Sequence, residues 1–165
     1  MACEPSIAAP IIAAVSALSG VALTLISSAI FSSKEREHKR KILLREKYEE
    51  LAILLVDSLE SYLTLLSSST SQELLLHARH AHAQKVDVLA RLYFPELKQL
   101  TSNYLFSLVA FQNSLAANYK PELKESAGVQ GANSVTVKAA QQNLESAKTS
   151  LDAAIEKHAS KYAIS

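Results

Sequence analysis

Three histidines and an arginine stand close together in HARHAHA, residues 77–83. Imidazole nitrogens can ligate divalent metals and can move protons near neutral pH, so this cluster is a candidate metal-binding or catalytic site. On a helix, His77 and His80 would stand three residues apart, a spacing that could hold a metal at the surface. No H-E-x-x-H motif, cysteine or carboxylate stands at ligand spacing beside them, so the sequence predicts no metal site. We expect His77 and His80 to face solvent and His82 to be half-buried.

The same histidines, spaced H-x-x-x-x-H from His77 to His82, resemble the degenerate catalytic motif of HEPN-type ribonucleases. The resemblance implies a helical bundle that dimerises to bring two motifs together, with histidine moving the proton of a 2′-hydroxyl group. The family prefers arginine first, and Arg79 has no histidine four to six residues later. His77 and His82 would also lie about 140° apart on an ideal helix. A membrane-tethered nuclease that uses these two histidines is therefore an alternative hypothesis.

Outside this cluster, the sequence has no phosphate-binding loop, no nucleophile elbow and no carboxylate pair on a common inner helix face. The six tyrosines lie mostly at positions of helical apolar stripes, where we expect a buried ring with its hydroxyl near water. The sequence therefore predicts a protein that is not an enzyme and that binds no cofactor.

An uncharged run covers residues 7–31, IAAPIIAAVSALSGVALTLISSAIF. About 20 apolar residues in a helix cross a hydrocarbon core of about 30 Å, so this run is long enough for a transmembrane helix. A signal peptide would carry basic residues first and a shorter apolar region, whereas the preceding residues contain Glu4 and no Lys or Arg. A buried helix of a soluble core is the third reading. We expect a retained span.

A cluster of positive charge follows this run, and its members are Lys34, Arg36, Lys39, Arg40 and Lys41. Basic residues are retained on the cytoplasmic side, so we expect the N-terminus outside and the rest of the chain in the cytoplasm, at a bacterial inner membrane. The same segment also suits a solvated helix face with ion pairs between Glu35 and Lys39 and between Glu37 and Lys41. Interspersed glutamates dilute the positive field, so no specific nucleic acid is expected as a partner.

The whole sequence is rich in Ala, Leu, Ser, Lys and Glu, with only three Gly, which predicts an all-α protein. Apolar positions three and four residues apart predict four helices that bury one face each. The residues expected inside include Ala81 and Leu92 on the second helix, Leu108 and Phe111 on the third, and Leu151 on the fourth, which we expect Ser134 to cap. The helices are expected at about 32–66, 71–94, 96–119 and 134–163, with 121–134 as a long loop. The fold class is thus an N-terminal transmembrane helix, 7–31, that continues into a cytoplasmic four-helix bundle, 32–165.

The layout also resembles a wider group of proteins. A single N-terminal span followed by KRKILLREKYEELAILL and VDVLARLYFPELKQL is similar to small bacterial inner-membrane proteins of mostly unassigned function. Some proteins of this layout are membrane accessories of phage defence, and some of those form oligomeric pores. The resemblance implies a membrane-acting, self-associating module.

Small and hydroxylated residues recur along one stripe of the predicted span, and they are Ala9, Ala13, Ser16, Gly20, Thr24 and Ser27. Such stripes let membrane helices approach closely, so we expect a homo-oligomer, either packed as an anchor or opened as a pore. The expected partners are the lipid bilayer and further copies of the chain. A passive adaptor that recruits a cytoplasmic protein is the remaining alternative.

Overall fold

The computed structural model describes residues 8–76 and 80–162. The side chains of residues 8–30, except Thr24, Ser27 and Ser28, and those of Ser71 and Leu75 lie outside this description. The described residues form helices joined by short turns, with no strand, as the composition predicts. In chain order the helices are α1 (Ala8–Ser67), α2 (Ser71–Leu76), α3 (Ala81–Tyr93), α4 (Lys98–Asn118), the short 3₁₀ helix η2 (Pro121–Leu123), α5 (Ala127–Ala132) and α6 (Val135–Tyr162).

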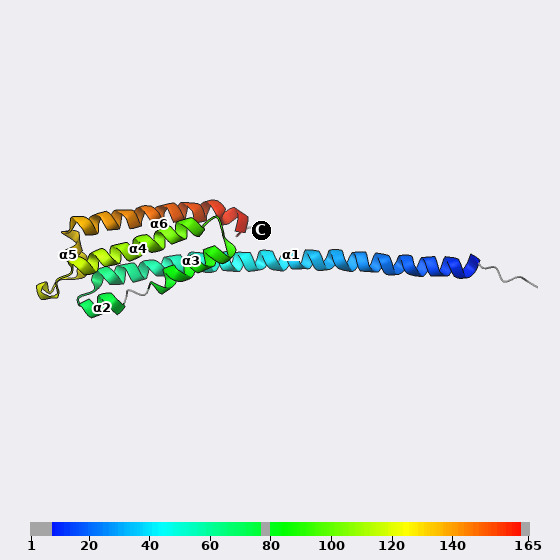
Figure 1. Cartoon of the computed structure of the whole chain (residues 1–165), viewed down its shortest axis with the longest axis horizontal. Helices are drawn as coiled ribbons and strands as arrows, with labels where there is room; N and C mark the ends of the chain where they lie inside the picture. The colour runs from blue at the N-terminus through cyan, green and yellow to red at the C-terminus, as the bar shows by residue number, and fades with distance from the viewer. Residues whose placement is uncertain (1–7, 77–79, 163–165) are drawn as a thin grey trace, which may run out of the picture. The chain divides into compact units, whose positions relative to one another are not determined.

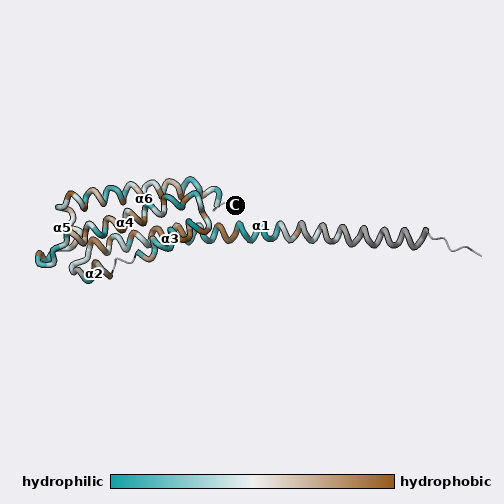
Figure 2. Tube along the Cα trace, in the orientation of Figure 1, coloured by the Kyte–Doolittle hydropathy of each residue, from teal (hydrophilic) through white to brown (hydrophobic). Residues whose placement is uncertain are grey.

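The chain divides into two units, residues 1–43 and 44–165. In the second unit, α3, α4 and α6 run alongside the last part of α1, with α5 at one end (Figure 1). The predicted stripes of α4 and α6 are confirmed: Leu108 and Phe111 are fully buried, and so is Leu151. Hydrophilic and hydrophobic residues can be followed in alternation along α6 in Figure 2. This unit is a helical bundle with one continuous core.

An aromatic cluster closes the end of the bundle where α6 finishes. The rings of Tyr48, Phe94 and Tyr162 lie with centroids 4.9–5.3 Å apart. Glu96 accepts hydrogen bonds from the Tyr162 hydroxyl, at 2.7 Å, and from Lys161. Because Phe94 and Glu96 flank Pro95, these contacts fix the turn between α3 and α4 against the last turn of α6.

The predicted helix 71–94 is wrong as a single element. It consists of α2 and α3, and the residue before α3, His80, has a left-handed backbone with φ 40° and ψ 36°. The break changes which face of the second helix is buried, since Ala81 and Leu92 were expected inside but are exposed. No proline or glycine marks the break in the sequence.

The predicted loop 121–134 is also wrong in part, because it contains η2 and α5. Its two glycines serve close packing. A Cβ atom on Gly128 would lie 2.9 Å from the Leu66 carbonyl oxygen, and one on Gly131 would lie 2.8 Å from a methyl carbon of Leu115. Ser126 caps α5 by accepting the Val129 amide. The segment is therefore packed onto the bundle.

In the first unit, α1 is helical from Ala8 onward. No helix of the described part contains a stretch that is long and apolar enough for a membrane span. Most of the expected span, 7–31, lies outside the residues whose side chains are described. The expected ion pairs Glu35–Lys39 and Glu37–Lys41 are confirmed, at 2.8 and 3.5 Å.

Candidate functional site

His80 was expected in solvent, and this prediction is wrong: its side chain is 4% exposed. Its Nε2 lies 2.5 Å from Oε1 of Gln112 on α4. Because that oxygen only accepts, Nε2 carries the proton and Nδ1 is the unprotonated nitrogen. Nδ1 is buried and has no hydrogen-bond partner among the described residues. His80 is therefore a buried neutral imidazole that is only half satisfied.

His80 is also unusual in its backbone conformation and in its place in the chain. It is the N-cap residue of α3, and its side chain caps no backbone amide. Burial lowers its pKa below the ordinary value of 6.5, and the Gln112 hydrogen bond opposes this only in part. A left-handed backbone at a non-glycine residue is unusual and is tolerated well by few side chains. Backbone, burial and electrostatics all distinguish this residue.

The other two histidines bear on the metal and nuclease hypotheses. His77 and Arg79 lie outside the described residues. His82 is half-buried, as expected, but its Nδ1 is buried without a partner in the described part. Within the described ranges, no group of three His, Cys, Asp or Glu residues is placed to hold a metal. The described residues thus join His80 to Gln112, whereas the proposed pairing of His82 with His77 lies outside them.

A buried charge lies further along α3. Asp87 is 6% exposed and accepts hydrogen bonds from Thr101 at 3.0 Å, Ser102 at 2.8 Å and Arg91 at 2.7 Å. Burial alone would raise the pKa of Asp87, but the bonds from Ser102, Arg91 and Thr101 outweigh it and lower the pKa. Every acceptor oxygen is satisfied, so this network fastens α3 to α4.

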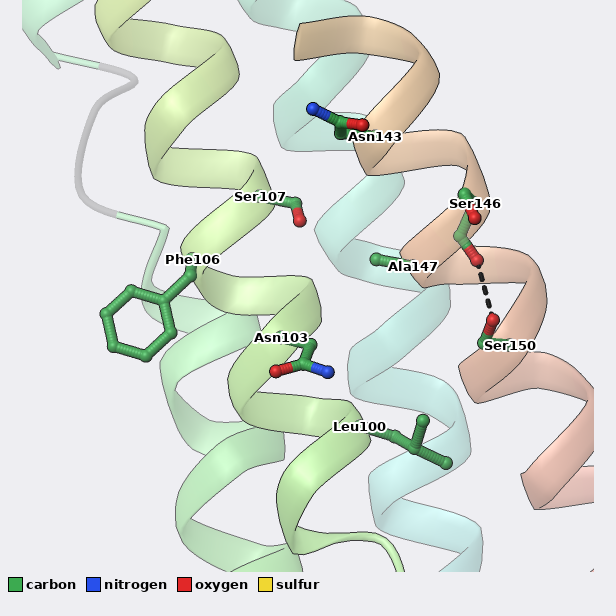
Figure 3. A pocket seen from close by; sticks show the side chains of 8 residues that line it. All are labelled: Leu100, Asn103, Phe106, Ser107, Asn143, Ser146, Ala147 and Ser150. Atoms are coloured by element: carbon green, nitrogen blue, oxygen red, sulfur yellow. Dashed lines mark hydrogen bonds between the residues drawn. The ribbon is translucent and has the colours of Figure 1, made fainter.

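A groove of about 460 Å³ lies between α4 and α6. Figure 3 shows Asn103 and Ser107 of α4 and Ala147 of α6 among the residues that line this groove. The Asn103 side chain accepts from Gln99, and the Ser150 hydroxyl donates to the Ser146 carbonyl oxygen. None of its eight lining residues is charged or titratable at neutral pH. The groove can bind neutral polar groups and offers no acid or base.

The residues of the predicted self-association stripe and basic cluster are placed only in part. Thr24 and Ser27 of the small-residue stripe are exposed, while the side chains of Ala9, Ala13, Ser16 and Gly20 lie outside the description. All members of the basic cluster are exposed. Arg36 donates to the Ser32 hydroxyl at 2.9 Å, one turn earlier. The cluster therefore presents its positive charge on the surface of α1.

The sequence analysis missed Gln112 and Asp87. Gln112 gave no signal, because its role depends on a residue 32 positions away. Asp87 and Arg91 stand four residues apart, and that spacing could have indicated a charged pair. Its burial could not have been foreseen without the helix break that sets the orientation of α3.

Comparison with known protein families, with curated proteins and with solved structures finds no match for this chain.

Proposed function

We propose that this protein is a membrane-anchored helical module that associates with copies of itself and acts at a bacterial inner membrane. One observation carries the proposal: the uncharged run 7–31 ends directly before the exposed basic cluster. An apolar segment of this length with positive charge on one flank is typical of a single-pass membrane protein. The bundle, residues 44–165, is then the cytoplasmic part.

The basic cluster supports the orientation. Lys39 and Lys41 pair with glutamates on the same helix, and these exposed pairs contribute little to stability. Their side chains can exchange a glutamate for an anionic lipid headgroup at small cost, since both partners stay in water. A cluster that is unnecessary for folding and adjoins an apolar run suits the inner surface of a membrane.

Self-association is proposed through the small-residue stripe. Gly20 and its neighbours at spacings of three and four would let two helix backbones approach closely, and the hydroxyls of Thr24 and Ser27 would bond across the contact. Two copies would make a dimeric anchor, whereas a ring would enclose a hydroxyl-lined path. By the resemblance to membrane accessories of phage defence, a ring would act by depolarising the membrane.

The test is Gly20→Leu in the full chain, reconstituted in vesicles at low protein-to-lipid ratio. Subunits per complex are counted by single-molecule photobleaching. The leucine should hold the helices apart and reduce the count, with about 1–2 kcal/mol lost for each contact. The matched control, Leu18→Ala, changes the opposite face and should leave the count unchanged. Equal counts for wild type and Gly20→Leu would refute self-association through this stripe.

A passive adaptor is the second candidate, and the α4–α6 groove favours it. Its uncharged hydrogen-bonding surface suits a segment of another protein more than a small charged metabolite. Ala147→Arg would fill the groove from α6. Loss of the cellular effect at an unchanged subunit count would indicate an adaptor, whereas a retained effect would exclude this groove as its docking surface.

A further inference from the structure

Among the side chains described at the start of α3, that of His80 makes the one hydrogen bond to α4, with Gln112, while Ala83 packs in the apolar core. The middle of α3 is fastened independently by Asp87, which accepts hydrogen bonds from Thr101 and Ser102. We propose that the His80–Gln112 contact is a proton-sensitive latch: protonation of His80 releases the start of α3 from α4 while α3 stays attached from Asp87 onward.

In the neutral state the contact is favourable. Nε2–H donates to the Gln112 amide oxygen, and the bare lone pair of Nδ1 is desolvated but carries no charge. An unpaired buried acceptor of this kind costs far less than a buried ion. The latch is therefore closed as long as the imidazole has one proton.

A second proton is opposed in three ways. It would sit on Nδ1, which has no acceptor among the described residues, so a buried donor would be left unpaired. It would place a cation at the N-terminus of α3, where the helix dipole disfavours positive charge. The first turn of α3 contains no acidic residue to compensate it. Exposure to water removes all three penalties, so protonation favours the open form.

The charged groups of the surrounding helices do not offset this. The α4 helix has no charged residue from Gln99 to Asn118. The Asp87 carboxylate is already bonded to three donors, and the Glu73 carboxylate bonds to the Ser69 amide. The pKa of His80 is shifted only by burial and by Gln112. The charged and titratable groups of the adjoining elements include His82, Lys85, Asp87 and Arg91 on α3, Lys98 on α4, Glu73 on α2, Asp57 and Glu60 on α1, and Lys138 and Glu145 on α6, and none of these is a cause of the shift.

The pH window follows from the direction of the shift. The pKa of His80 is lowered in the closed form and returns to about 6.5 in the open form. Above 6.5 the latch is fully effective. As the pH falls below 6.5 the open form binds a proton that the closed form does not, so the opening equilibrium rises by up to about tenfold per pH unit. Asp87 and Glu96 have lowered pKa values, so they titrate at more acidic pH and fall outside this window.

Amide hydrogen exchange of the full chain in lipid nanodiscs tests the latch. The Gln84 amide donates to the His80 carbonyl oxygen at 2.9 Å, so it reports on the first turn of α3. The Phe94 amide, which donates to Ala90, reports on the other end. From pH 6.5 to 5.5, the opening constant derived at Gln84, after division by the intrinsic exchange rate, should rise by up to about fivefold, because the open form is already half protonated at pH 6.5. That at Phe94 should stay constant.

Two variants complete the test. His80→Gln keeps a donor for Gln112 but cannot be protonated, and Gln112→Glu gives the imidazolium a carboxylate. Both should remove the rise at Gln84, whereas the control His82→Gln should retain it. A Gln84 opening constant that does not change with pH in the wild type would overturn the proposal. So would a rise that persists in both His80→Gln and Gln112→Glu.

Discussion

The two units of the chain are held together in different ways. In residues 44–165, buried side chains from α1, α3, α4 and α6 make one core, and polar groups such as Asp87 and Tyr104 are bonded across helices. In residues 24–43, the ion pairs of the described side chains join residues four positions apart on one helix. The first arrangement depends on long-range packing, and the second depends on local spacing.

This difference predicts that one unit determines the stability of the fold and the other determines where the protein is located. The core of residues 44–165 uses its own side chains, so its folding should not depend on residues 1–43. The side-chain contacts described in residues 32–41 join neighbouring turns of one helix, so this segment can adapt to other surroundings, and the proposed surroundings are the membrane and its surface. Changes in one unit should therefore affect unfolding, and changes in the other should affect attachment and orientation.

The largest effect on folding is expected for Leu108→Asp. Leu108 is 0% exposed on α4, so the carboxylate would lose its water and the core would lose a side chain. We expect about 3–5 kcal/mol less stability in urea unfolding of the bundle. The control Ala110→Asp, on an exposed position of the same helix, should change little. If Leu108→Asp also detached the protein from membranes, the two units would not be independent.

A smaller loss is expected for Asp87→Asn. The amide is neutral and leaves Arg91 without its anion, while Thr101 and Ser102 lose a strong acceptor. We expect about 1–3 kcal/mol at neutral pH. The pKa of Asp87 is lowered from 3.8, so the contribution is present above that value and is lost as the pH falls through the lower, folded pKa. The variant should therefore approach wild-type stability in acid, and a constant difference at all pH values would argue against the network.

Glu96→Gln is expected to matter less. Bonds from Lys161 and Tyr162 hold the pKa of Glu96 at about 2, below its ordinary 4.5. Its contribution is present above pH 4.5 and is lost between 4.5 and about 2. Because part of the side chain meets water, the loss should be about 0.5–1 kcal/mol in thermal unfolding at pH 7. The control Glu156→Gln should have no effect. An equal loss of stability in the two variants would show that it comes from the change in net charge and not from the Glu96 hydrogen bonds.

The smallest effect on folding is expected for reversal of the basic cluster, with Lys39, Arg40 and Lys41 changed to Glu. All three side chains are exposed, so unfolding of residues 44–165 should be unchanged. The protein should insert into the membrane in both orientations, since the positive charge that keeps this flank in the cytoplasm is lost. Lys138→Glu on α6 is the control for net charge. A destabilised bundle would show that the cluster belongs to the fold.

Much of the fold could be predicted from periodicity. The apolar stripes of α4 and α6 repeat every three and four residues without interruption, so Leu108, Phe111 and Leu151 were identified as core. The Ser134 cap before α6 was identified from residue type alone, and its hydroxyl accepts the Val137 amide. Structural features that depend on residues close together in the sequence, such as apolar stripes and helix caps, can be predicted without a structure.

Features that depend on distant neighbours were not predictable. The segment around His80 contains good helix-forming residues, and the break there accompanies a contact with Gln112 on another helix. Gly128 and Gly131 indicated a loop, because glycine is common in loops. Here they lie within a packed segment, where the missing Cβ atom leaves room for Leu66 and Leu115. The burial of His80 and the exposure of Leu92 were therefore not foreseen from the sequence.

The central proposal is that residues 7–31 cross the inner membrane with the bundle in the cytoplasm, and cysteine accessibility in intact cells tests it most directly. Cys3 is the single cysteine of the chain, and a second can be introduced as Ala139→Cys at an exposed position of α6 in a Cys3→Ser background. With the outer membrane permeabilised, an impermeant maleimide should label Cys3 at once. It should label the Ala139→Cys protein only after the inner membrane is also opened. Labelling of the Ala139→Cys protein from outside, or its release from membranes by alkali, would contradict the account.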